Sequence, residues 1–227
     1  MMSGSAALAP EIHKKWKELT GQELLERYGM TEVGMALSNK INGEKRPGSV
    51  GVTLPGVEVK IEDDNGNIIV NEGEAGQLLI KGPQVFLEYL NQPDKTKESF
   101  KGDWFLSGDI VMLERGHYKI LGRDSVDIIK SGGYKISALE IEDVLLKNTK
   151  IRECAVVGIK DDKWGEIVAS GIVCKEDSLN IDDITEWCSN YLSDYKIPRK
   201  IKILDDLPKN SMGKVTKPAL KQLFINK

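Results

Sequence analysis

An aromatic ring, a hydroxyl and a carboxylate occur within five consecutive residues, Tyr28-Gly29-Met30-Thr31-Glu32. A ring can stack on a nucleobase, a hydroxyl can bind a phosphate, and a carboxylate can hold Mg²⁺. Side by side where a strand gives way to a turn, these three groups would suit a nucleotide. A plain polar turn is the alternative, and for a pentapeptide by itself it is the commoner explanation.

A second candidate is Asp109, which follows the aromatic segment WFLSG at residues 104–108. A carboxylate in such a place can accept hydrogen bonds from both hydroxyls of a ribose, as acidic residues do in dinucleotide sites. A turn-capping aspartate explains this segment equally well.

Two glycine-containing loops complete the set of candidates. Lys214 directly follows Gly213 in a turn-prone loop, where a lysine can serve as a point charge for phosphate and carboxylate oxygens. This loop is not a Walker A motif, because the sequence contains no GxxxxGK[ST]. Gly132-Gly133 lies between two expected strands, where glycine permits a tight turn or the close approach of a ligand. An exposed lysine and a simple turn are the respective alternatives.

The first forty residues, which carry the tyrosine motif, are expected to hold one helix and one strand. Apolar residues at Ile12, Trp16 and Leu19 have the spacing of a helix over residues 11–19, and residues 23–28 are typical of a short buried strand. A helix and one strand cannot cover both faces of a core. This segment is therefore expected to be the edge of a larger one.

The rest of the chain shows two further sequence patterns. From residue 46 to 121, short alternating segments separated by turn residues predict a β-rich subdomain, with Asn65-Gly66 as the clearest hairpin signal. After residue 123, strands and helices alternate, which predicts a small α+β domain. The elements expected there are strands at 126–130, 134–137, 151–159 and 167–174, and helices at 138–148, at 181–192 and from 217 onwards.

Composition excludes several classes of protein. The 227 residues are 40% hydrophobic and 30% charged, and no apolar run approaches the roughly 20 residues of a membrane-spanning helix. Three cysteines without a CxxC pair favour buried thiols in a reducing compartment over a disulfide framework. Two distant histidines and the lack of a GxSxG segment argue against a zinc site and a Ser-His-Asp triad.

The net charge of -3 hides an asymmetry, because residues from Tyr195 onwards contain nine lysines and arginines against two aspartates. Such a tail could meet a polyanion such as a nucleotide, coenzyme A or nucleic acid. A solvated lysine-rich surface is the usual explanation of a charge run. Nucleic acid is the least favoured partner, because no aromatic-interleaved platform accompanies the charges.

In their order and joint occurrence, these motifs closely resemble the adenylate-forming superfamily of acyl-CoA synthetases over essentially the whole chain. The segments LLERYGMTEVGMALS at 24–38, RPGSVG at 46–51 and SVDIIKSGGYK at 125–135 look most like the malonyl-CoA synthetases. Nonribosomal adenylation domains usually carry a different glycine segment and are disfavoured. The resemblance implies that a carboxylate attacks the α-phosphate of Mg-ATP to give an acyl-adenylate. The thiol of coenzyme A then displaces AMP.

The resemblance also implies a role for each candidate in the first step. Tyr28 would pack on the adenine, Thr31 would touch the α-phosphate, and Glu32 would hold Mg²⁺. Asp109 would bind the ribose hydroxyls with help from Arg123.

Four further residues complete that site by the same resemblance, and a fifth is added as our own hypothesis. Gly4, Ser5 and Ala6 would line the adenine and acyl pocket. Lys214 would bridge the substrate carboxylate and the α-phosphate, and so stabilise the negative charge that builds during adenylation. Arg27 is our hypothesis for reading a second carboxylate by bidentate pairing, with a surface arginine as the equal alternative.

For the second step the resemblance implies that a small, mobile C-terminal domain rotates about a hinge just after Arg123. One extra residue relative to many relatives leaves the hinge open among Asp124, Ser125 and Val126. Rotation would withdraw Lys214 and bring the glycine pair to the pantetheine channel. The residues expected to contact coenzyme A are Gly132, Gly133, Trp164 and Lys135, with Lys196 and Arg199 as weaker candidates for its phosphates.

The predicted fold is α+β. Residues 1–122 are expected to be the C-terminal part of the AMP-binding N-terminal domain, with the edge of its core at 1–40 and the β-rich subdomain at 41–122. Residues 123–227 are expected to be the C-terminal lid domain. The family's Ser/Thr/Gly-rich phosphate loop does not occur in this sequence.

The predicted function is an acid–CoA ligase fragment that activates a small carboxylic acid, with malonate as the first candidate, and uses ATP, Mg²⁺ and coenzyme A. Because the phosphate loop is missing, the isolated chain is expected to be inactive. The alternative is a non-catalytic nucleotide- or CoA-binding remnant, or a subunit completed by a separate N-terminal polypeptide. Neither nucleic-acid binding nor a membrane span is expected. The expected location is intracellular, in the cytoplasm or the mitochondrion.

Overall fold

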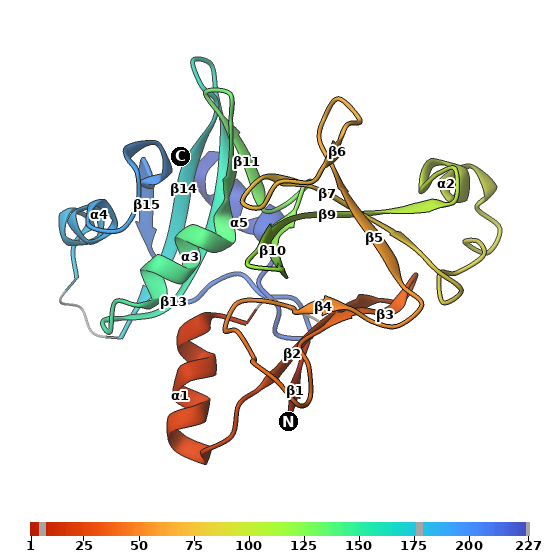
Figure 1. Cartoon of the computed structure of the whole chain (residues 1–227). Helices are drawn as coiled ribbons and strands as arrows, with labels where there is room; N and C mark the ends of the chain where they lie inside the picture. The colour runs from red at the N-terminus through yellow and green to blue at the C-terminus, as the bar shows by residue number, and fades with distance from the viewer. Residues whose placement is uncertain (5–7, 176–178, 226–227) are drawn as a thin grey trace. The chain divides into compact units, whose positions relative to one another are not determined.

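The computed structural model describes residues 1–4, 8–175 and 179–225. It divides into two compact units, Met1–Asp124 and Ser125–Lys227. Figure 1 labels most of the helices and strands of both units. No helix of the described residues is long and apolar enough to cross a membrane.

Unit 1 begins with a four-stranded sheet and one helix (Figure 1). The strand order is β1-β2-β3-β4, in which β1 runs parallel to β2 and the other neighbours are antiparallel. The elements are β1 (Met2–Ser3), α1 (Pro10–Thr20), β2 (Leu25–Met30), β3 (Gly34–Ser38) and β4 (Val52–Thr53). The prediction of a single strand in residues 1–40 is wrong, because the two-residue β1 and the five-residue β3 are too short to show a clear alternation.

The helix predicted at 11–19 is confirmed, but the residues that it buries are not the apolar residues from which it was predicted. Ile12 is 54% and Leu19 is 76% exposed, whereas His13 is buried. The Nδ1 atom of His13 lies 2.8 Å from Oε1 of Glu26, which is itself buried on β2. Burial of both groups is possible because each supplies the other's hydrogen bond.

The second sheet of unit 1 is antiparallel, with the order β10-β9-β7-β5-β6 and with β8 paired to β9. Its elements are β5 (Glu58–Glu62), β6 (Ile68–Ile69), β7 (Ala75–Lys81), α2 (Pro93–Glu98), β8 (Phe100–Lys101), β9 (Trp104–Glu114) and β10 (His117–Arg123). The hairpin predicted at Asn65-Gly66 joins β5 to β6 and is confirmed. One core contains residues of both sheets, including Leu37 of β3, Leu78 of β7 and Phe105 of β9.

Unit 2 is a sheet between two layers of helices (Figure 1). The strand order is β12-β11-β14-β13, and β15 runs parallel to β14. The elements are β11 (Ile128–Ser131), β12 (Tyr134–Ser137), α3 (Ala138–Leu146), β13 (Ile151–Asp161), β14 (Gly165–Cys174), α4 (Ile181–Ser189), a 3₁₀ turn (Asp194–Lys196), β15 (Lys200–Ile203) and α5 (Lys217–Ile225). The strands and helices predicted after residue 123 are confirmed within a few residues, whereas β15 was not predicted.

Strand alternation places the two cores of unit 2 on opposite faces of its sheet. Val156 and Val168 pack in the cluster that contains residues of α3 and α4, and Val157 and Ala169 pack in the cluster that contains Leu220 of α5. Successive side chains of a strand point to opposite faces, so β13 and β14 must be apolar on both. Of the three thiols, Cys188 is buried and the other two are half-buried.

Candidate functional site

Three residues that are far apart in the sequence meet in unit 1. The hydroxyl of Tyr28 on β2 donates a hydrogen bond to Oδ2 of Asp109 on β9 at 2.5 Å. Nε of Arg123, which faces Asp109 across the β9–β10 ladder, lies 3.3 Å from Oδ1 of the same carboxylate. The structure thus brings together the residues predicted for adenine and ribose. The antiparallel register explains the meeting of Asp109 and Arg123, while the Tyr28 contact depends on how two sheets pack.

The electrostatics of this cluster keep the tyrosine protonated. Burial raises the pKa of the Tyr28 hydroxyl well above its ordinary value, and the neighbouring Asp109 carboxylate raises it further. Tyr28 therefore acts as a hydrogen-bond donor that orients the carboxylate. A carboxylate offers about four acceptor positions, so the two described partners leave capacity for two hydroxyl donors.

Glu32 follows β2 in the turn that also holds the exposed Thr31. Its Oε1 accepts a hydrogen bond from the hydroxyl of Tyr89 at 2.8 Å. Burial and the hydrogen bond to Glu32 raise the pKa of Tyr89. Tyr89 was not predicted, and no sequence signal pointed to it, because it lies 57 residues from its partner in a loop.

The turn after β2 depends on glycine at position 29. A Cβ atom there would lie 2.0 Å from the carbonyl oxygen of Gly34, on the paired strand β3, so no larger residue fits without moving the backbone. This close approach coincides with a register shift between Tyr28 and Gly29. The irregularity sets where the side chains of Tyr28 and Thr31 emerge.

Glu32 is the residue predicted to hold Mg²⁺. In the described part of the chain no three His, Cys, Asp or Glu residues lie close enough to form a metal site. Mg²⁺ is commonly held by one or two carboxylates together with the phosphates of its nucleotide. The donor set therefore fits a nucleotide-bound Mg²⁺ and does not fit a metal site built from protein ligands alone.

The predicted acyl-pocket residues are only partly described. Ser5 and Ala6 lie outside the described residues. Gly4 follows β1, and a Cβ atom on it would lie 3.3 Å from Cγ of Arg27, so glycine lets the backbone pass close to that side chain. Arg27 lies half-buried on β2 opposite Ser38, and among the described residues it has no ion pair.

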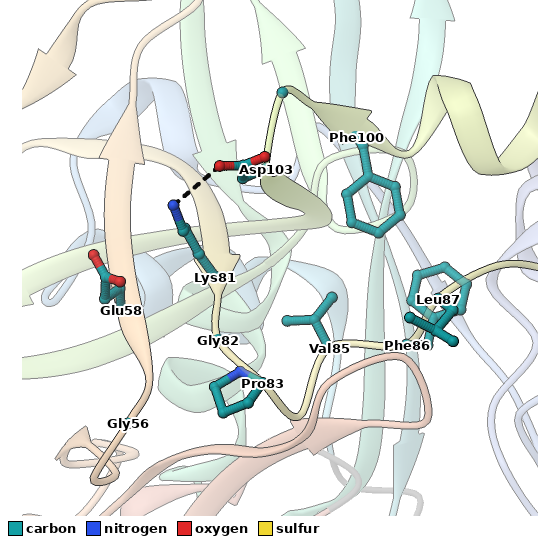
Figure 2. Close-up of a pocket in the computed structure, with 11 residues that line it drawn as sticks. Gly56, Glu58, Lys81, Gly82, Pro83, Val85, Phe86, Leu87, Phe100 and Asp103 are labelled. Atoms are coloured by element: carbon teal, nitrogen blue, oxygen red, sulfur yellow. Dashed lines mark hydrogen bonds and ion pairs between the residues drawn. The ribbon is translucent and has the colours of Figure 1, made fainter.

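Unit 1 also contains a hollow of about 570 Å³ that includes none of the predicted residues (Figure 2). Figure 2 shows Val85, Phe86, Leu87 and Phe100 on one side of it and a charged group on the other. The charged residues are Glu58 and the ion pair of Lys81 with Asp103, whose Nζ–Oδ2 distance is 3.1 Å. The lining carries one more negative than positive charge. It therefore suits an anionic phosphate poorly, and we do not place a nucleotide there.

In unit 2, the glycine pair and the predicted tryptophan are neighbours. The amide of Gly132 donates to the carbonyl of Trp164 at 2.9 Å, and a Cβ on this glycine would lie 3.0 Å from Cε3 of the indole. Gly132 and Gly133 both have positive φ, at 57° and 84°. The guanidinium of Arg199 lies 4.6 Å from the centre of the Trp164 ring. Three predicted coenzyme contacts and one weaker candidate thus share one surface, which the chain order did not show.

The two other candidates near this surface differ in their environment. Lys135 is exposed on β12. Lys196 binds the carboxylate of Glu140, with Nζ 2.6 and 2.8 Å from its two oxygens, so much of its charge is already compensated. Next to these lysines, the exposed rings of Tyr134 and Tyr195 stack at a centroid distance of 4.6 Å.

Lys214 is exposed in the loop before α5. The loop is closed by a bridge between Lys209 and Val215 and by the side chain of Asn210, whose Oδ1 accepts from the amides of Met212 and Lys214 at 3.0 Å each. The Lys214 carbonyl accepts from the Asn210 amide at 2.8 Å. These bonds hold the backbone of Lys214, and the residue itself is exposed.

Two family models match this chain. Residues 1–90 match the AMP-binding enzyme model, and residues 140–214 match the model of the AMP-binding enzyme C-terminal domain. The mitochondrial malonate–CoA ligase of Bos taurus is 45% identical over 99% of this chain and 42% of its own length. The malonate–CoA ligase of Arabidopsis thaliana is 43% identical over 100% of this chain and 39% of its own length. The chain thus spans about two fifths of these relatives.

Solved structures of the same kind of enzyme also resemble this chain. The ATP-bound MatB structure from Rhodopseudomonas palustris is 36% identical and covers 99% of this chain with a TM-score of 0.91, and the match takes in 45% of that chain. The anthranilate CoA ligase AuaEII, solved with anthranoyl-AMP, is 32% identical with a TM-score of 0.88 and covers 98% of this chain and 44% of its own. The chain therefore belongs to the AMP-binding enzyme family, whose main model and C-terminal-domain model match residues 1–90 and 140–214.

Proposed function

We propose that this chain is the C-terminal portion of an acid–CoA ligase that activates a small carboxylic acid as an acyl-adenylate and transfers the acyl group to coenzyme A. The observation that carries the proposal is the Tyr28–Asp109–Arg123 cluster, because it presents an oriented carboxylate beside an aromatic ring. Those are the groups that a ribose and an adenine require. We further propose that the two units correspond to the end of the AMP-binding domain and to its C-terminal lid.

For adenylation, we assign Asp109 to the ribose hydroxyls, Thr31 to the α-phosphate and Glu32 to Mg²⁺. The metal would neutralise charge on the phosphates, and Tyr89 would hold the Glu32 carboxylate in place through its hydroxyl. Lys214 would supply a point charge to the substrate carboxylate and the α-phosphate as negative charge develops. Loss of such a group commonly lowers the rate by about 10²–10³-fold.

For thioester formation, we assign the backbone at Gly132 and Gly133 to the pantetheine arm. The absence of side chains at this turn leaves room for a ligand chain beside Trp164. Lys135 and Arg199 are the proposed phosphate ligands. Because Lys196 is paired with Glu140, it is a weaker candidate than the sequence suggested.

The acid is proposed to be malonate, by similarity to the malonate–CoA ligases, and Arg27 is the proposed partner of its second carboxylate. A half-buried arginine without a described ion pair suits an anionic ligand, because a guanidinium can bind a carboxylate with two parallel hydrogen bonds. Other relatives act on different acids by name, including long-chain fatty acids at 35% identity. If Arg27→Ala lowered activity with malonate and with a monocarboxylate equally, this assignment would be wrong.

The proposal is tested by measuring malonate-dependent pyrophosphate release from ATP. The 227-residue chain alone should show negligible release, because no phosphate-binding loop of the family type occurs in its sequence. Mixing it with the preceding part of MatB from Rhodopseudomonas palustris should restore release, and Lys214→Ala should abolish the restored activity. Rapid release by the chain alone, or restored release that survives Lys214→Ala, would contradict the proposed roles.

A non-catalytic nucleotide- or CoA-binding subunit is the second candidate, because the Tyr28–Asp109 pair and the surface around Trp164 could bind these ligands without catalysis. Tight AMP binding without any restored pyrophosphate release would favour it. For the compartment, we propose the cytoplasm or the mitochondrion, and the relative from Bos taurus is named as mitochondrial.

A further inference from the structure

A largely buried cluster of three charged side chains lies in unit 2, and none of the three has been given a role so far. Nζ of Lys217 is 2.6 Å from Oδ1 of Asp127 and 2.9 Å from Oε1 of Glu142. The three side chains are 11%, 18% and 15% exposed, in that order. Oε1 of Glu142 also accepts the amide of Val156 on β13 at 2.7 Å. One ammonium group thus joins the start of unit 2, helix α3 and helix α5, and through Glu142 it contacts β13.

The start of a helix is an unfavourable position for the positive charge of Lys217. Lys217 is the first residue of α5, where the unpaired amides and the helix dipole favour acidic side chains over basic ones. Burial also disfavours its charged form, but the attraction of Glu142 and Asp127 outweighs burial and raises the pKa of Lys217. The ammonium is therefore stabilised by tertiary contacts alone.

The cluster contacts two segments of unit 2: the end of the loop that carries Lys214 and the first residues of the unit. Lys217 lies three residues after Lys214, and the intervening Thr216 donates its amide to the carbonyl of Pro208, at the other end of the loop, at 2.8 Å. Asp127 lies three residues after Asp124, the last residue of unit 1. The loop that carries Lys214 and the first residues of unit 2 are thus attached to the same ammonium.

We propose that Lys217 is a positioning residue for Lys214, which fixes the end of the lysine loop to the chain segment that follows the boundary between the units. The segment 125–128 and the loop 209–216 then move as one body with unit 2. This inference rests on the role proposed for Lys214. It differs from a simple stability role, because it requires two segments about eighty residues apart in the sequence to loosen together.

The test is hydrogen–deuterium exchange on the 227-residue chain under native conditions. Lys217→Met should speed exchange in 125–128 and 209–216 by about ten- to a hundredfold, the factor that corresponds to losing one hydrogen bond to a charged group. The amides of the β13–β14 ladder should keep their wild-type rates. Lys217→Arg, which keeps the positive charge, should return both segments toward the wild type.

Lys221→Met is the matched control, because Lys221 is also on α5 but only reaches Glu166 at 3.9 Å. It should leave both segments unchanged. If Lys217→Met does not fold, Glu142→Gln replaces it, since Asp127 remains as a partner of Lys217. It should then give the same pattern at a smaller amplitude.

A uniform increase across unit 2 would show that Lys217 is merely structural and would overturn the proposal. So would an increase in only one of the two segments, or none. Because no ligase activity is measured, these outcomes are separate from a failure of the proposed function. If exchange behaves as expected while pyrophosphate release is never restored, the coupling stands and the enzymatic role of Lys214 does not.

Discussion

Replacing Tyr28 by phenylalanine removes a single hydroxyl from the proposed ribose site. That hydroxyl donates to Oδ2 of Asp109 at 2.5 Å, and Asp109 is only 8% exposed. In the variant the buried carboxylate would keep Nε of Arg123 at 3.3 Å as a side-chain partner, and the arginine side chain is half exposed. The substitution therefore leaves a buried charge with a weaker set of donors.

The expected loss follows from these contacts. A hydrogen bond to a charged group contributes about 1.5–3 kcal/mol to stability. The partly exposed Arg123 pair is worth about 0–1 kcal/mol and cannot replace it. Tyr28→Phe should therefore lower the free energy of unfolding of unit 1 by about 1.5–3 kcal/mol and leave unit 2 unchanged.

The assay is urea unfolding followed by amide resonances, which report the two units separately. Tyr118→Phe is the matched control, because Tyr118 is half-buried in the same unit and no hydrogen bond of its hydroxyl is described. It should change stability by less than about 0.5 kcal/mol. The double-mutant cycle with Asp109→Asn should give a coupling energy close to the Tyr28→Phe loss. Equal effects of Tyr28→Phe and Tyr118→Phe, or a coupling near zero, would refute the reasoning.

Three further predictions concern the same sites. The raised pKa of Tyr28 means that the folded state holds the phenol proton more tightly than the unfolded state does. The contribution of Tyr28 to stability is therefore complete below about pH 10 and falls above it, by up to about 1.4 kcal/mol per pH unit. In urea unfolding at alkaline pH, the free energy of unfolding of Tyr28→Phe should decline less than that of the wild type. Asp109→Ala should weaken AMP binding about ten- to a hundredfold by calorimetry, whereas Asp103→Asn, on the exposed Lys81 pair, should not. Gly132→Ala and Gly133→Ala should each destabilise unit 2 by about 1–2 kcal/mol, because both glycines have positive φ. Gly132→Ala should cause the larger loss, because its Cβ atom would contact the Trp164 ring. Equal losses of the free energy of unfolding in urea would contradict this contact.

The basic residues after Tyr195 are interpreted differently from the sequence and from the structure. From the sequence, the excess of positive charge after Tyr195 suggested a polyanion partner or a solvated surface. In the structure, four of those lysines lie within ion-pair distance of carboxylates of unit 2, at positions 196, 209, 217 and 221. Part of the tail's charge is thus compensated within the unit, whereas Lys214 is exposed in its loop.

Local patterns were sufficient to predict most elements and the identity of the candidate groups. Helix α1, the Asn65-Gly66 hairpin and the alternating strands β13 and β14 follow from periodicities of a few residues, which the backbone geometry imposes wherever they occur. The motifs around Tyr28 and Lys214 also stand out in the sequence, because each places unusual chemistry beside glycine. These features need no knowledge of distant contacts.

Only the tertiary structure decided which of those groups act together. The hydroxyl of Tyr28 meets a carboxylate 81 residues away, and that of Tyr89 meets one 57 residues away, because separate strands and a loop pack against each other. The same holds for Lys217, whose unfavourable place at the start of a helix makes sense only beside Asp127 and Glu142. Hydrogen bonds and ion pairs act over a few ångströms in space, and chain order does not encode that distance.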